Sequence, residues 1–204
     1  PDILLSKYGK EPVRWYLLKD ITLGSDGDFQ NKRFVDIINN DLANTIGNLL
    51  NRTSSMSRKW FNNRVPSNER LSKDNTLELY AKKTVENYFR HFNSYELDLA
   101  ANVILSLAIN TNLYLNEKQP WTLIKEEKNI PFVRNIIYSV LESTRIVGLL
   151  LLPILPNLSS KIDQQLGLLY NEKESWKKQL EWGKLIHESI LPAPNPVIEK
   201  LEYE

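Results

Sequence analysis

The sequence of 204 residues contains no cysteine. Disulfide bonds, thiolate zinc sites and cysteine nucleophiles are therefore excluded from this chain. Its two histidines, His91 and His187, have no partner at ligand spacing, so we expect no metal site. Neither a glycine-rich phosphate loop nor a serine–histidine–acid order is present, and we expect no catalytic residues. The most apolar run, residues 146–156, is too short for a bilayer and contains two prolines, so we expect no membrane partner.

Glycine is also scarce, with seven residues in the whole chain, and strand signals are almost absent apart from a weak one at 21–23. From residue 29 to 60, apolar side chains recur at three- and four-residue steps, which predicts one long amphipathic helix. The same periodicity predicts helices at about 74–92, 96–116 and 131–147, and one ending at Gly167. The fold class is therefore all-α, an antiparallel bundle of about five main helices. Residues 1–28 form a short helical connector, 29–190 the bundle, and the proline-rich residues 191–204 an extended tail.

The predicted helix at 29–60 carries a polar row that includes Asn48 and Arg52. Side chains four residues apart are neighbours on one helix face. An amide offers donors and acceptors, and a guanidinium offers a planar fork of donors, so the two can hold a base edge or a phosphate. Alternatively, both side chains only solvate the outer face of the helix.

Two further features point in the same direction. Trp121 follows a proline after a helix end, which favours either an exposed stacking platform or a plug between helices. Residues 52–73 contain six basic residues and one acidic residue, with two aromatic residues among them. Such a stretch is compatible with nucleic-acid binding, and equally with a solvated helix end and loop.

The order of six segments resembles the C-terminal part of bacterial-type methionyl-tRNA synthetases, a family of class I aminoacyl-tRNA synthetases. The resemblance covers nearly the whole chain, and NLLNR and PW are its more specific parts. The segments are PDILLSKYG, VRWYLL, SDGDF, DLANTIGNLLNR, LNEKQPW and PNPVIEKLE.

The resemblance implies that Asn48, Arg52 and Trp121 contact the CAU anticodon of methionine tRNA, chiefly its first base. Residues 1–28 would end the stem-contact region, 29–190 would form the anticodon-binding bundle, and 191–204 would be the returning strap. Candidate phosphate contacts are Arg58, Lys59 and Arg64.

The same resemblance implies a cytoplasmic ligase that joins methionine to its tRNA with ATP and Mg. The catalytic motifs of the family lie upstream, so we expect this chain alone to hold no cofactor and to be inactive. Its partners would be methionine tRNA and the catalytic domain of the same polypeptide. Two alternatives stay open: a helical domain of another class I synthetase, such as the isoleucine, valine or cysteine enzyme, and a helical protein-interaction module without RNA binding.

Overall fold

The computed structural model describes residues 2–21, 24, 26–67, 74–168 and 173–203 of the chain. The described residues are helical, without a strand, apart from one isolated antiparallel bridge between Arg64 and Ile190. The predicted all-α bundle is therefore confirmed, whereas residues 22 and 23 of the weak strand signal lie outside the described residues. The elements are α1 (Asp2–Tyr8), α2 (Lys10–Asp20), α3 (Asn31–Ile37), η1 (Ile38–Gly47), α4 (Asn48–Trp60), α5 (Thr76–Asn93), α6 (Leu97–Lys118), α7 (Pro120–Leu123), η2 (Glu127–Asn129), α8 (Ile130–Leu151), α9 (Pro156–Gln165) and α10 (Trp176–Gln179).

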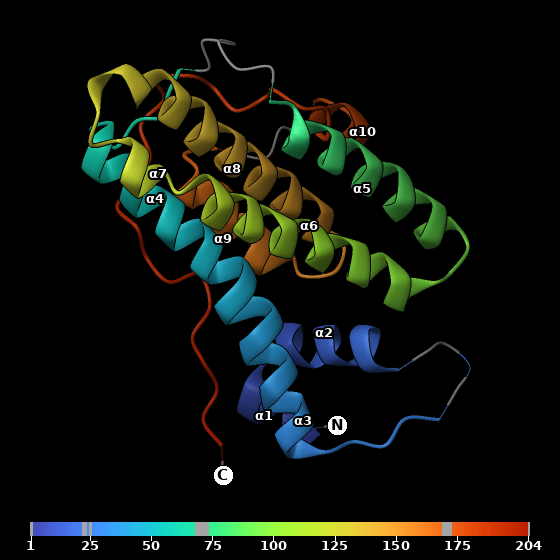
Figure 1. Ribbon diagram of the computed structural model, residues 1–204. Coiled ribbons are helices and arrows are strands. Elements are labelled where there is room, and N and C mark those ends of the chain that lie inside the picture. Colours follow the sequence, from blue (N-terminus) through green and yellow to red (C-terminus); the bar gives the residue numbers. More distant parts are fainter. Residues whose placement is uncertain (1, 22–23, 25, 68–73, 169–172, 204) are drawn as a thin grey trace.

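The bundle is organised around α8, which contacts α4, α5, α6 and α9 (Figure 1). Most of α8 beyond its first turn is buried, because apolar residues occupy nearly all of its faces. Gly148 allows α9 to approach closely, since a Cβ built at this position would lie 2.9 Å from the Cγ2 atom of Ile162.

A buried ion pair ties the segment before the tail to α8. Glu142 and Arg145 are 0% and 3% exposed, and their nearest charged atoms are 2.6 Å apart. Glu142 also accepts hydrogen bonds from the backbone N–H groups of Gly183 and Leu185 at 2.7 and 3.0 Å. Arg145 donates to the carbonyl oxygen of Gln179 at 2.6 Å. Each carboxylate oxygen of Glu142 and each guanidinium nitrogen of Arg145 therefore has a hydrogen-bond partner.

The long helix predicted for 29–60 is a continuous helical run from Asn31 to Trp60, but its central part is wider than expected. Between Ile38 and Gly47 the run is a π-helix, and the N–H of Asn48 donates to the carbonyl of Ala43, five residues earlier. The π-helical geometry has a basis in the sequence, because the apolar residues Phe34, Ile38, Leu42 and Ile46 recur at four-residue steps. In a regular α-helix each such step rotates by about 40° away from a straight row. The wider turns keep all four side chains buried.

The C-terminal tail is extended, as predicted, and runs back along the 31–60 helical run towards α1 and α3 (Figure 1). Side-chain amides bind its backbone at two points. Gln165 donates to the Ala193 carbonyl at 3.3 Å and accepts from the Asn195 N–H at 3.0 Å. Asn39 makes the same two-way contact with Leu201, at 2.9 and 2.8 Å. We call residues 191–203 the strap.

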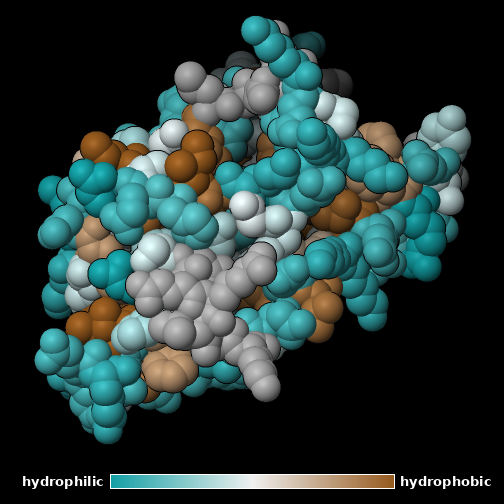
Figure 2. Space-filling view, turned by 90° about the horizontal axis from the view of Figure 1, so that it is seen from above, coloured by the Kyte–Doolittle hydropathy of each residue, from teal (hydrophilic) through white to brown (hydrophobic). Residues whose placement is uncertain are grey.

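Seen from above, the molecule is mainly hydrophilic, and its hydrophobic residues lie in small separate patches (Figure 2). Within the part of the chain that the structure describes, none of the helices has both the length and the apolarity to cross a membrane.

Candidate nucleic-acid interface

The predicted polar row lies on the outer face of the 31–60 run. Asn44, Asn48 and Asn51 are exposed, and Arg52 is half-buried. The leucines between them, Leu49 and Leu50, are each 1% exposed and face the core. Among the described residues, the side chains of Asn48 and Asn51 have no hydrogen-bond partner. The helix therefore presents amides whose donors and acceptors are available to a ligand.

Trp121 lies at the surface, on the short helix α7. The preceding Gln119 adopts a left-handed conformation (φ 44°, ψ 57°), which ends α6 and lets the buried Pro120 begin α7. The side chain of Trp121 is 39% exposed, so it does not plug the helix junction. The guanidinium carbon of Arg52 lies 6.0 Å from the centroid of the Trp121 ring, at the outer limit of a cation–π contact.

Asn116, on the last turn of α6, connects the two predicted readers. Its Oδ1 atom accepts a hydrogen bond from Nη2 of Arg52 at 3.0 Å. Asn116 could not be singled out from the sequence, because the contact joins residues 64 positions apart. The only available signal was its place within the LNEKQPW segment, just before Trp121. The amide directs the guanidinium of Arg52 towards the indole.

The end of α6 is fixed by an ion pair. Nζ of Lys118 lies 2.6 Å from Oδ2 of Asp74, before the first turn of α5. Burial raises the pKa of Asp74, but hydrogen bonds from Lys118 and Thr76 outweigh burial and lower the pKa to about 2. Asp74 is thus ionised at any pH near neutrality. Its ion pair with Lys118 fixes the last residue of α6, directly before the turn to α7.

The predicted phosphate contacts occupy different environments. Arg58 and Lys59 are exposed on the last turn of α4, and neither has an ion-pair partner among the described residues. Arg64 is exposed as well, but its Nη1 atom donates to the carbonyl oxygen of Glu188 at 2.8 Å. The further basic residues at 70 and 73 lie outside the described residues. Arg58 and Lys59 extend the polar face of the helical run by one to two turns.

A groove with a volume of about 390 Å³ lies between this polar face and the strap. Asn44, Asn48 and Asn51 line it on the helix side, and residues 196–200 line it on the strap side. Asn48 therefore borders the groove, while Arg52 turns to the other flank, towards α6 and α7. Within the described residues no group of three or more histidine and acidic side chains is placed to hold a metal ion.

Two known families match parts of the chain. Residues 1–54 match the family described as "tRNA synthetases class I (M)", and residues 65–203 match "Anticodon binding domain of methionyl tRNA ligase". Among curated proteins, the methionine–tRNA ligase of Nostoc sp. is 37% identical over 98% of this chain and 39% of its own length. That of Bacillus subtilis is 34% identical over 100% of this chain and 31% of its own length.

Solved structures resemble the whole described fold. The free form of Mycobacterium tuberculosis methionyl-tRNA synthetase superimposes with a TM-score of 0.91 at 30% identity, over 99% of this chain and 41% of that chain. The same protein in complex with methionyl-adenylate gives a TM-score of 0.88 at 31% identity, over 96% of this chain and 38% of that one. The chain thus spans about two-fifths or less of the relatives it matches.

Proposed function

This chain belongs to the family of anticodon-binding domains of methionyl-tRNA ligases, and from that membership we propose that it reads the CAU anticodon of methionine tRNA. Trp121 stacks on the first anticodon base, cytosine, while Arg52 and Asn48 hydrogen-bond its edge. Family membership favours this reading over a domain of the isoleucine, valine or cysteine enzymes.

One observation carries the proposal: an exposed indole and a guanidinium from another helix meet at the surface, 6.0 Å apart, although 69 positions separate Arg52 from Trp121. Stacking of one base on an aromatic side chain contributes about 1–3 kcal/mol. A wrong base leaves donors or acceptors of Arg52 and Asn48 unpaired, which costs about 1–3 kcal/mol more. Together these effects are large enough to select one tRNA from others.

Basic side chains at and beyond the end of α4 supply the proposed contacts with the RNA backbone. Arg58 and Lys59 on the last turn of α4, with Arg64 four residues beyond its end, hold backbone phosphates of the anticodon arm. Residues 1–28 form the end of the stem-contact region, 29–190 the anticodon-binding bundle, and 191–204 the strap. We propose that the chain is part of a longer cytoplasmic ligase, whose catalytic domain uses ATP with Mg and is the intramolecular partner of this bundle. By itself the chain would not attach methionine.

The test is Trp121→Ala in the full-length protein. We expect tRNA affinity to fall about 5- to 150-fold, the loss of one stacked base, while methionyl-adenylate formation stays nearly normal. Tyr80→Ala is a matched control, because Tyr80 is a similarly exposed aromatic residue (44%) on α5. An equal loss of both activities would instead indicate that Trp121 supports folding.

Salt dependence tests whether the ligand is RNA at all. Phosphate contacts require the logarithm of tRNA affinity to fall linearly with the logarithm of salt concentration. A helical protein-interaction module predicts no such slope, and it predicts no preference among tRNAs with different anticodons. Filter binding with methionine, isoleucine and valine tRNAs measures both properties in one series.

A further inference from the structure

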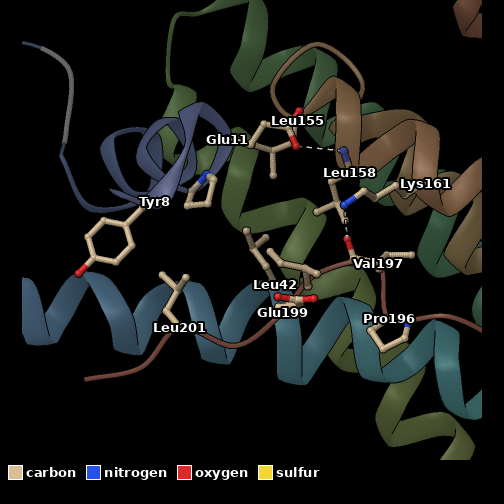
Figure 3. Close-up of a pocket in the computed structure, with 12 residues that line it drawn as sticks. Tyr8, Glu11, Leu42, Leu155, Leu158, Lys161, Pro196, Val197, Glu199 and Leu201 are labelled. Carbon is tan, nitrogen blue, oxygen red and sulfur yellow. Dashed lines mark hydrogen bonds between the residues drawn. The ribbon is translucent and has the colours of Figure 1, made fainter. Parts of the chain in front are cut away.

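A carboxylate from α2 caps the start of α9. The side-chain oxygens of Glu11 accept hydrogen bonds from the backbone N–H groups of Asn157 and Leu158, at 2.5 and 3.0 Å. Figure 3 shows Glu11 pointing from α2 towards α9. The first N–H groups of a helix have no partner within the helix, and a negative charge is favourable beside them. Leu155, directly before α9, makes no capping hydrogen bond, so the cap comes from another helix, 146 positions earlier in the chain.

A second charged side chain of α2 binds the other side of the same turn. Nη1 of Arg14 donates to the carbonyl oxygen of Ile154, just beyond the end of α8, at 2.7 Å. Glu11 and Arg14 are three residues apart, so they lie on one face of α2. The two side chains therefore hold the turn between α8 and α9 at both of its ends.

The helix α2 also makes polar contacts with two further helices. Trp15 is 0% exposed, and its Nε1 atom donates to Oδ2 of Asp41 in the π-helix η1 at 3.0 Å. Lys19 donates to the side-chain oxygen of Asn102 on α6. Hydrogen bonds are directional, whereas apolar contact is not. These bonds therefore fix the direction of α2 relative to the bundle.

Packing is incomplete on the side of α2 that faces α9 and the strap. A cavity of about 320 Å³ lies there, lined among others by Glu11, by Leu158 and Lys161 of α9, and by residues 196–199 of the strap (Figure 3). Elsewhere the interior of a protein is close-packed. Because side chains do not fill this space, the bonds of Glu11 and Arg14 set the angle of α2 on this side.

The contact between α2 and the α8–α9 turn lies far from the proposed base readers. In Figure 1, α1 and α2 lie at the end of the molecule that holds the N-terminus, whereas α7, which carries Trp121, lies at the opposite end of the bundle (Figure 1). A change at Glu11 or Arg14 can therefore alter the orientation of α2 without touching the residues that would bind RNA.

Resting on the proposed function, we propose that Glu11 and Arg14 are positioning residues for the charging of tRNA. Their bonds to the α8–α9 turn set the angle between α2 and the bundle, and with it the place of the catalytic domain that precedes α1 in the full-length protein. A tRNA bound through its anticodon at Trp121 then reaches that domain with its acceptor end in position. Neither residue contacts the RNA, the amino acid or ATP in this role.

The test is Glu11→Gln in the full-length protein, which removes the charge and replaces one acceptor oxygen by an NH₂ donor. A misplaced acceptor end slows the joining step, because reaction rates depend steeply on position. We expect kcat/KM for charging of whole methionine tRNA to fall about tenfold, while methionyl-adenylate formation and affinity for an anticodon stem-loop RNA change less than about twofold. A purely structural role would not separate these three measurements.

Arg14→Met is the second variant, because Arg14 is exposed and methionine is a comparably good helix former. We expect the same pattern with a smaller loss of charging, about three- to fivefold. Ser175→Ala is the matched control, because it also removes the cap of a helix, in this case α10. It should leave all three measurements unchanged.

If both variants charge whole tRNA as well as the wild type does, the two residues do not position the tRNA and the inference is overturned. An equal loss in all three measurements would also overturn it, because it would show that the residues support folding. The wild-type protein distinguishes these failures from failure of the proposed function. Equal affinity of the wild type for stem-loops with methionine and isoleucine anticodons would contradict the proposed function itself.

Discussion

Two helices of this bundle each carry two polar residues that lie about one turn apart, but one pair is buried with its partners and the other lies at the surface. On α8, Glu142 and Arg145 are buried, paired with each other and bonded to the backbone of residues 179–185. On α4, Asn48 is exposed and its side chain has no hydrogen-bond partner among the described residues. Within the same residues, the guanidinium of Arg52 donates one hydrogen bond, to Asn116, and lies over the ring of Trp121.

The comparison shows how a structural pair differs from a ligand-binding one. A buried charge is tolerated only when its partners are complete, and the α8 pair meets this condition. The α4 pair leaves hydrogen-bonding capacity at the surface, beside an exposed indole and a groove. Spacing along a helix is nearly the same in both cases, so only the surroundings separate the two roles.

The largest expected effect is on the α8 side of the comparison. Glu142→Ala leaves the Arg145 guanidinium buried without its carboxylate and removes the acceptor of the Gly183 and Leu185 N–H groups. We expect the free energy of unfolding to fall by about 3–5 kcal/mol. Chemical denaturation measures the change. Glu126→Ala is the control, because that carboxylate belongs to an exposed pair with Lys128 and should change stability by less than about 0.5 kcal/mol.

If Glu142→Ala were no more destabilising than the control, the contrast between the two helices would lose its energetic basis.

A smaller effect comes from Asp163 on α9, a carboxylic acid that is 6% exposed and whose Oδ1 atom has no hydrogen-bond partner. Burial raises its pKa to about 6, although Arg145 lowers it in part. In the unfolded chain the same group ionises near pH 4, so between about pH 4 and 6 the native state binds more protons. The free energy of unfolding must therefore fall as pH rises through this window, by at most about 3 kcal/mol.

Asp163→Asn should remove this slope and make the protein more stable than the wild type at pH 7. Denaturation of both proteins at pH 4.5 and pH 7 measures the difference, in which the other titrating groups cancel. A slope that is the same in both proteins would show that Asp163 titrates alike in the native and unfolded states.

The smallest effect is expected at the exposed end of α4. Lys59→Gln should lower tRNA affinity by roughly two- to fivefold, equally for every anticodon, and reduce the slope of log affinity against log salt by about 1. Lys128→Gln is the control, since that ammonium pairs with Glu126 at 2.9 Å. A loss confined to one anticodon sequence would place Lys59 among the base readers instead of the phosphate contacts.

Much of the helical framework could be predicted from the sequence. The helix expected at 96–116 is Leu97–Lys118, and the one expected from 131 begins at Ile130. These elements depend on the local periodicity of apolar residues, which the sequence displays directly. The π-helix at Ile38–Gly47 was missed because four-residue steps were interpreted with α-helical geometry, although the steps themselves contained the signal.

The candidate site was predictable only in part. Asn48 and Arg52 could be placed in one row, because i and i+4 residues of a helix are neighbours by geometry alone. For Trp121 the spacing alone favoured a buried plug over a surface platform, but the structure exposes the ring. Neither Asn116 nor the groove could be foreseen, since both arise from contacts between segments far apart in the chain.

The sequence by itself determined that this protein is helical, which faces of its helices are apolar, and where its chain must turn, because each of these depends on interactions within a few residues. Tertiary structure alone decided that Arg52, Asn116 and Trp121 meet, that the strap lies beside Asn48, and that Glu142 is buried while Asn48 is exposed. These outcomes depend on how whole helices pack, and the packing minimises exposed apolar surface over the entire chain, which no local pattern records.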